Sequence, residues 1–188
     1  VDAITDVVVE EESQGTDLVE VTLAAPGSYA LPDHVEHASA LGTTAVGLAG
    51  NGLPNWLTGN LAGNSLQGGD GNDTLDGGAG NDTMTGGAGN DRYQLNASTD
   101  VVNETAPGSD GFDTVVLSLP GSGSYTLPAG VEYATVEGSA GSAVNLVGNA
   151  LANVLRGHAG NNSLAGGDGV DALWPGIGSD TVDGGNDN

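Results

Sequence analysis

Aspartates that recur every nine residues are the side chains of this sequence best suited to chemistry. Three consecutive nonapeptides, GGDGNDTLD, GGAGNDTMT and GGAGNDRYQ, run from residue 68 to residue 94, and their sixth positions are Asp73, Asp82 and Asp91. Each carboxylate accompanies glycines that let backbone carbonyl oxygens approach a cation closely. Ca²⁺ takes about 6 to 8 such oxygen ligands at roughly 2.3–2.6 Å, more than one nonapeptide supplies. The pattern therefore predicts Ca²⁺ sites that are shared between repeats.

The nine-residue pattern extends toward the N-terminus as the same ladder of position-6 residues, with asparagine in place of aspartate. Steps of nine lead back to GNLAGNSLQ from Gly59 and GNGLPNWLT from Gly50, where position 6 is Asn64 and Asn55. Asparagine offers a neutral oxygen and an amide donor, so it is a poorer calcium ligand than aspartate. We expect these turns to be poor in metal and to be held by the asparagine side chains.

A second run of the pattern begins at Gly148. It reads GNALANVLR, GHAGNNSLA, GGDGVDALW, PGIGSDTVD and a truncated GGNDN. Its sixth positions are Asn153, Asn162, Asp171 and Asp180, so asparagine again gives way to aspartate. Pro175 replaces the first glycine of one repeat and fixes φ near −65°, which puts the ion site of that turn in doubt.

The predicted metal ligands are acidic residues of both runs and turn glycines whose carbonyls complete the coordination shells. They are Asp70, Asp73, Asp82, Asp91, Asp168, Asp171, Asp180, Gly69, Gly71, Gly78, Gly80, Gly87, Gly89, Gly167 and Gly169. The sequence predicts neither a catalytic residue nor an organic cofactor site.

Short strands must position these ligands. The apolar residue at position 8 of each perfect repeat (Leu75, Met84, Tyr93) is expected to point inward, with positions 7 and 9 outward, because strand side chains alternate. Outside the nonapeptides, further apolar or β-branched runs are bounded by Gly, Pro, Ser or Asp, and none carries a helical period. These expected strands cover residues 7–9, 18–23, 115–119, 125–127, 131–136 and 144–147. The predicted fold class is all-β.

The sequence is an internal duplication. The pattern S-Y-x-L-P-x-x-V-E occurs at Ser28 and again 96 residues later at Ser124, and D-V-V-x-E occurs at Asp6 and at Asp100. We predict a first module over 1–94, with calcium nonapeptides over 50–94, and a second over 95–188, with nonapeptides over 148–188. One continuous quasi-linear stack is favoured because no linker-like stretch separates the modules. The alternative is two small β domains joined by a linker.

The pattern G-G-x-G-x-D-x-U-x, where U is a large apolar residue, resembles the RTX (hemolysin-type) calcium-binding repeat proteins of bacteria. The resemblance covers nearly the whole chain, but only the nonapeptides are specific. It implies a parallel β-roll or β-solenoid in which two nonapeptides make one turn and each ion lies between stacked turns. On that basis, Asp73 and Asp91 are expected to face one another across one ion.

Composition narrows the classes of partner. The net charge is −23, and Arg92 and Arg156 are the two strong cations. This balance excludes binding to a nucleic-acid backbone or to anionic lipid as a main role. Without cations, the stacked carboxylates repel and the glycines carry a large folding entropy. We therefore expect order that depends on millimolar Ca²⁺, in a secreted protein at the cell surface or outside the cell. The absence of cysteine agrees with stabilisation by metal.

Other candidate motifs do not indicate a catalytic or phosphate-binding site. The segment DHVEH at residues 33–37 lacks the spacing of zinc hydrolases, and its counterpart at residues 129–133 has no histidine. We interpret it as part of a surface strand. The glycine-rich stretches are not followed by lysine, so they are not phosphate cradles. The sequence shows neither a signal peptide nor a transmembrane segment. A non-enzymatic chain is predicted.

Two functions fit these observations. The leading hypothesis is a calcium-dependent structural repeat segment of a secreted bacterial protein, such as an adhesin stalk, surface layer or extracellular fibre. The alternative is a C-terminal folding and secretion module of an enzyme, such as a protease, lipase or epimerase, that uses a type I exporter. More copies of the module upstream favour the first, and an upstream catalytic domain favours the second. Since both termini fall inside the repeat pattern, we also expect end-to-end self-association into filaments.

Overall fold

Strands of two to six residues alternate with glycine-rich turns throughout the structure, a computed structural model that describes residues 1–3, 5–11, 15–105, 109–138 and 143–186. The described residues contain no helix, and every strand pairing between them is parallel, which confirms the predicted all-β parallel solenoid. The last two residues of the truncated GGNDN repeat lie outside the described residues. Two units are distinguished: Val1–Tyr93 with Thr99–Gly111, and Gln94–Ser98 with Phe112–Asn188.

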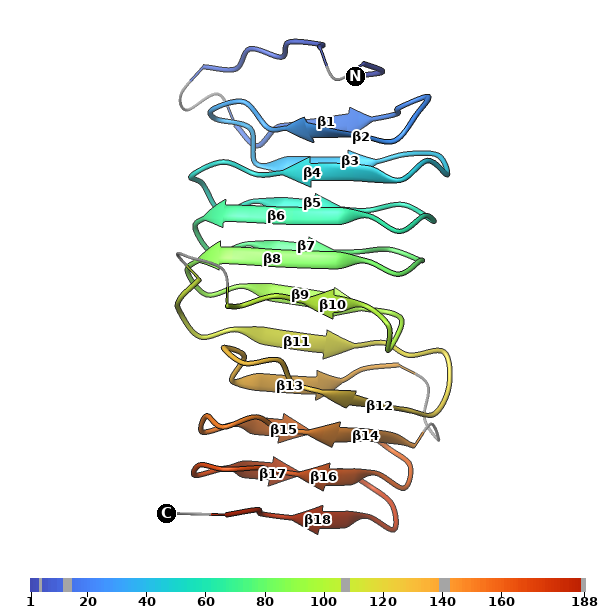
Figure 1. Cartoon of the computed structure of the whole chain (residues 1–188), viewed down its shortest axis with the longest axis vertical. Coiled ribbons are helices and arrows are strands. Elements are labelled where there is room, and N and C mark those ends of the chain that lie inside the picture. The colour runs from blue at the N-terminus through green and yellow to red at the C-terminus, as the bar shows by residue number, and fades with distance from the viewer. Residues whose placement is uncertain (4, 12–14, 106–108, 139–142, 187–188) are drawn as a thin grey trace. The chain divides into compact units, whose positions relative to one another are not determined.

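The first unit has strands on two sides of each coil, and the chain alternates between the two sheets (Figure 1). One sheet is ordered β1-β3-β5-β7 and continues into β9, and the other is ordered β2-β4-β6-β8-β10. The strands are β1 (Leu18–Val21), β2 (Gly27–Ala30), β3 (His37–Ala40), β4 (Val46–Ala49), β5 (Trp56–Thr58), β6 (Ser65–Asp70), β7 (Thr74–Asp76), β8 (Thr83–Ala88), β9 (Arg92–Leu95) and β10 (Val101–Val102). The boundary between the units falls within β9.

The second unit repeats this arrangement. Its sheets are ordered β11-β13-β15-β17 and β12-β14-β16-β18. The strands are β11 (Thr114–Leu117), β12 (Gly123–Thr126), β13 (Tyr133–Val136), β14 (Val144–Val147), β15 (Val154–Arg156), β16 (Ser163–Ala165), β17 (Ala172–Trp174) and β18 (Thr181–Asp183). In both units, consecutive strands of one sheet within the nonapeptide run are 18 residues apart, so two nonapeptides make one turn.

The core of each unit is a column of position-8 side chains. In the first unit, Leu57, Leu66, Leu75, Met84 and Tyr93 are buried, as predicted from the alternation of strand residues. In the second unit, Leu155 and Leu164 are buried in the same way, but Val182 on β18 is 49 % exposed. Each side chain covers the one in the preceding turn, so β18, the last strand of its sheet, leaves its apolar residue partly uncovered.

Two sequence-based expectations about strands are wrong. Residues 7–9 form no strand, and Val7 and Val9 are exposed, whereas the matching Val101 and Val102 form β10 because they pair with Thr83 and Met84 of β8. The strand-forming sequence alone is therefore insufficient without a neighbouring strand. Residues 33–36 also form no strand: His34 has a φ of 68° in a turn, and β3 begins only at His37.

No helix within the described residues has the length and apolar character that a membrane span requires.

Candidate calcium sites

Position 6 of each nonapeptide lies directly before a strand, and its side chain joins consecutive turns. In the first unit, Asp73 Oδ1 accepts a hydrogen bond from the Asn55 N–H (2.7 Å), and Asp91 Oδ1 accepts one from the Asp73 N–H (2.8 Å). On the other side of the coil, Asp82 Oδ1 accepts from the Asn64 N–H (2.8 Å). One oxygen of each carboxylate is thus used to hold the backbone of the preceding turn.

The second unit contains the same ladder. Asp171 Oδ1 accepts a hydrogen bond from the Asn153 N–H, and Asp180 Oδ1 accepts one from the Asn162 N–H, both at 2.8 Å. Every one of these bonds joins residues 18 apart, which is one turn of the solenoid. The ladder therefore brings position-6 residues of alternate repeats together on neighbouring turns, and that Asp73 and Asp91 share one ion stays a prediction.

The second carboxylate oxygen is the candidate calcium ligand. The Oδ2 atoms of Asp73, Asp82 and Asp171 are buried, and none has a hydrogen-bond partner among the described residues. Burial disfavours the charged form and raises the pKa of Asp73 and Asp82 to about 6 each. Burial also raises the pKa of Asp91 to about 7, and the charge of Asp73 adds to this shift. A buried carboxylate oxygen without a donor is costly, and a bound cation removes that cost.

Backbone carbonyl oxygens lie beside these carboxylate oxygens. A Cβ atom on Gly68 would collide with Asp73 Oδ2 and would lie 2.6 Å from the Gly86 carbonyl oxygen of the next turn. A Cβ on Gly166 would meet Asp171 Oδ2 and the Gly184 carbonyl oxygen in the same way. Neither glycine has a positive φ, so position 1 is glycine for lack of space. In each case a carboxylate oxygen and a carbonyl oxygen, both hydrogen-bond acceptors, lie close together without a donor between them, as a cation site requires.

The asparagine repeats show what satisfies the same carbonyls without an ion. The side-chain amide of Asn162 donates to the carbonyls of Gly160 (3.0 Å) and Pro175 (3.2 Å). The amide of Asn64 donates to the equivalent carbonyls of Ala62 (2.6 Å) and Gly77 (3.4 Å). These carbonyls belong to position 4 of the same repeat and position 1 of the next turn. The expectation that asparagines hold the turns is therefore confirmed, and the amide occupies the place where the aspartate repeats present a second oxygen.

The other predicted ligands lie in the turns around these groups. The position 2 and 4 glycines of the aspartate repeats adopt positive φ angles, which suits a residue without a Cβ. The predicted ligands among these glycines are Gly69, Gly71, Gly78, Gly80, Gly87, Gly89, Gly167 and Gly169. Asp70 and Asp168 are exposed, and the Asp70 charge contributes to the raised pKa of Asp73. Which of these groups coordinates each ion stays a prediction.

Two glutamates that sequence reasoning missed serve the same ladder. Glu36 Oε2 accepts a hydrogen bond from the Asp17 N–H (3.0 Å), and Glu132 Oε2 accepts one from the Asp113 N–H (2.8 Å). Each glutamate lies just before a strand, as the position-6 aspartates do. The signal was present in the duplicated S-Y-x-L-P-x-x-V-E pattern, which ends on these residues.

Comparison with known proteins agrees with this geometry. A family model described as the RTX calcium-binding nonapeptide repeat (4 copies) matches residues 58–93 and 147–182. A search of curated proteins found no match, and a search of solved structures found none either. The matched segments contain the ladders of Asp73, Asp82 and Asp91 and of Asp171 and Asp180. Residues 58–93 and 147–182 thus carry RTX calcium-binding nonapeptide repeats, and repeats of this kind bind several calcium ions.

Proposed function

We propose that this chain is a structural segment of a secreted bacterial protein and that Ca²⁺ completes its fold outside the cell. The observation that carries the proposal is the buried Oδ2 of Asp73, Asp82 and Asp171, placed beside glycine carbonyls and without a hydrogen-bond donor among the described residues. Burying these oxygens together without a partner costs free energy, and a hard divalent cation bound between them offsets that cost. Folding and calcium binding are therefore one coupled event.

The carboxylates support a structural role rather than catalysis. Asp73, Asp82 and Asp171 each use one oxygen to hold a backbone N–H of the preceding turn, and the other oxygen lies against backbone. A general acid or base needs access to a substrate proton, which these buried atoms lack. The proposal accordingly places no reaction on the repeats.

An extracellular location follows from the calcium requirement. Each occupied site stabilises the folded chain by RT ln(1 + [Ca²⁺]/Kd), about 2.7 kcal/mol at a hundredfold excess over Kd. A chain with a net charge of −23 has few cations of its own to offset its carboxylates. The chain would fold where calcium is millimolar and remain unfolded where calcium is scarce. This behaviour suits a stalk, surface layer or fibre that assembles after export.

The test is calcium-gated folding. We expect a coil-like far-UV circular dichroism spectrum in EGTA and a β-rich spectrum in millimolar Ca²⁺. Mg²⁺ at equal concentration should substitute poorly because it requires shorter bonds and near-octahedral geometry. A complete β spectrum in chelator, unchanged by added calcium, would contradict the proposal.

A further inference from the structure

A non-repeat segment takes the place of a nonapeptide after the first run. Asp100 Oδ1 accepts a hydrogen bond from the Asp82 N–H (3.1 Å), as a position-6 residue does. Val101 and Val102 form β10 beside Thr83 and Met84 of β8, and Val102 is buried at the position-8 place. The D-V-V-x-E segment thus extends the coil without the glycines of the repeat.

Glu104 is the last residue of this segment, and its side chain accepts a hydrogen bond that a backbone carbonyl accepts in other turns. The position-1 N–H groups of Gly50, Gly59 and Gly166 donate to backbone carbonyls of the next turn. The corresponding N–H of Gly86 instead donates to Glu104 Oε1 at 3.4 Å. Glu104 is 6 % exposed, and its carboxylate is buried.

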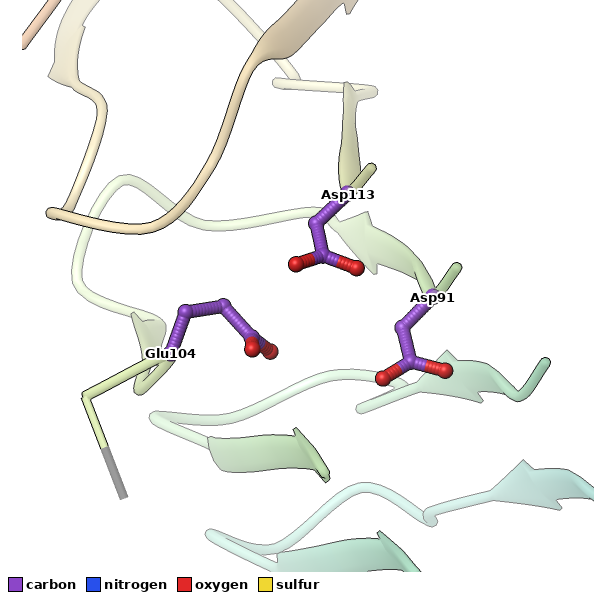
Figure 2. Close-up of side chains that lie close together, drawn as sticks. All are labelled: Asp91, Glu104 and Asp113. Carbon is purple, nitrogen blue, oxygen red and sulfur yellow. The ribbon is translucent and has the colours of Figure 1, made fainter. Parts of the chain in front are cut away.

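The Glu104 carboxylate also lies near Asp91. A Cβ on Gly86 would collide with Asp91 Oδ2, just as one on Gly68 would collide with Asp73 Oδ2. Beside Asp73 the next-turn oxygen is a neutral carbonyl, but beside Asp91 it is a carboxylate: oxygens of Asp91 and Glu104 lie within 4.8 Å of each other. Figure 2 shows the two carboxylates turned toward one another. Two ligand oxygens of one ion are at most about twice a Ca–O distance of ~2.4 Å apart, and this pair lies within that limit, so one ion can bridge them.

Tyr93 provides an independent sign of a ligand at this place. Its side chain is fully buried, and its hydroxyl has no hydrogen-bond partner among the described residues. A Cβ on Gly86 would collide with Tyr93 Oη as well as with Asp91 Oδ2, so the hydroxyl points at the same spot. The four preceding nonapeptides of the first unit place Leu or Met at this position, and both are apolar. A buried hydroxyl without a partner is costly, which indicates that a polar ligand belongs there.

We propose that Asp91 and Glu104, with the Tyr93 hydroxyl beside them, form a further divalent-cation site that ends the first nonapeptide run. The inference rests on the proposed calcium-dependent function, and it adds a ligand from outside the repeats. Two carboxylates at one ion bind Ca²⁺ more tightly than one carboxylate and a carbonyl, because affinity rises with the charge of the ligands. This site should therefore fill before the Asp73 site as calcium rises.

The chain supplies a matched control. Glu10 ends the other D-V-V-x-E segment, but it is only partly buried, and residues 7–9 form no strand beside a nonapeptide. The full chain, Glu104→Gln and Glu10→Gln would be compared by equilibrium dialysis against Ca²⁺ and by the calcium midpoint of the β spectrum. Glu104→Gln should bind one ion fewer per chain and need more calcium to fold, whereas Glu10→Gln should match the unaltered chain.

The results separate this inference from the proposed function. Calcium binding by the unaltered chain with the same ion count and midpoint in Glu104→Gln overturns the Glu104 site alone. Absence of calcium binding by the unaltered chain overturns both. If Glu104→Gln does not fold, the luminescence of bound Tb³⁺, excited through tyrosine, tests whether a cation binds beside Tyr93. Tyr93→Phe should lose most of the sensitised emission and Tyr29→Phe should retain it, and unchanged emission from Tyr93→Phe rejects the site.

Discussion

At the scale of single residues, the contrast between aspartate and asparagine at position 6 defines how each turn is held. Both types accept a backbone N–H from the turn before, as Asp82 and Asn162 do. They differ in the second side-chain atom, which is a carboxylate oxygen in Asp82 and an amide that donates to carbonyls in Asn162. We therefore expect an aspartate turn to depend on a cation and an asparagine turn to be independent of one.

This contrast predicts opposite effects of Asp73→Asn with and without calcium. The variant removes a buried charge and supplies an amide donor, so in EGTA it should retain more β structure than the unaltered chain. In calcium it should lose the stabilisation of one site, about 2.7 kcal/mol at a hundredfold excess over Kd. The far-UV circular dichroism spectrum in EGTA measures the first effect, and urea unfolding in Ca²⁺ measures the second.

The choice of control for Asp73→Asn follows from burial. Asp17 is unsuitable as a control, because its Oδ2 is buried without a hydrogen-bond partner among the described residues. Asp33 lies in an exposed turn of the same unit, so Asp33→Asn should change neither curve. Equal loss of calcium-linked stability in Asp33→Asn and Asp73→Asn would contradict the ligand assignment.

The raised pKa values predict how pH acts on the calcium-free form. Folding raises the pKa of Asp73 and Asp82 from 3.8 to about 6, and that of Asp91 to about 7. The folded state therefore binds protons more tightly than the unfolded state, and this contribution to stability is complete below about pH 4. It is lost as pH rises through 6 to 7. The β signal of the far-UV circular dichroism spectrum in EGTA should therefore fall from pH 4 to pH 7.5.

Calcium affinity should change in the opposite direction, because protons compete with the ion for the same oxygens. The calcium concentration at half-folding should fall as pH rises to about 7 and then level off. A calcium midpoint that is constant between pH 5 and pH 7.5 would show that these carboxylates are not the ligands.

At the scale of the strands, three-residue elements such as β5 and β7 are stable only in the stack. Leu75 at the centre of β7 is fully buried between Leu57 of β5 and the next turn, while Leu61 in a turn is 70 % exposed. A strand this short buries a single side chain, so the column of position-8 residues supplies most of the apolar contact.

Leu75→Ala should accordingly destabilise the calcium-bound chain by about 2–5 kcal/mol, the usual cost of a cavity at a buried leucine. Leu61→Ala should change the stability by less than about 0.5 kcal/mol, as expected for an exposed side chain. Thermal and urea unfolding in millimolar Ca²⁺ give both values. Similar losses in the two variants would mean that the position-8 column is not the core.

At the scale of the whole molecule, charge and an uncovered strand set the conditions for self-association. The net charge of −23 makes copies of the chain repel one another until bound calcium reduces it. β18 is the last strand of its sheet and leaves Val182 half exposed, and an unpaired parallel edge can accept another strand.

We therefore expect association of copies that requires calcium. Sedimentation velocity should show larger species in millimolar Ca²⁺ and a monomer in EGTA. Val182→Lys should reduce the association and keep the β spectrum, since the side chain is exposed. A strict monomer at high protein concentration in millimolar Ca²⁺ would reject this prediction.

The nonapeptide run by itself determined the fold class, the inward side chains and the positions of the candidate ligands. Spacing carries this information because each repeat must adopt the same turn and strand, and glycine and aspartate have few alternative uses at such intervals. The asparagine turns were predictable for the same reason: one amide group can hold a turn through hydrogen bonds within a single neighbouring coil.

Only the tertiary structure decided which oxygen of each aspartate is left without a hydrogen bond to the preceding turn and which other residues lie near the candidate sites. Residues 7–9 and Val101–Val102 have nearly the same sequence, yet only the latter form a strand, because only they have β8 beside them. The sequence did not indicate Glu104 as a candidate ligand, because Glu104 comes near Asp91 only when the intervening segment folds into a coil of the solenoid. Contacts between turns join residues 18 or more apart, so they depend on the stacking of coils rather than on any local pattern.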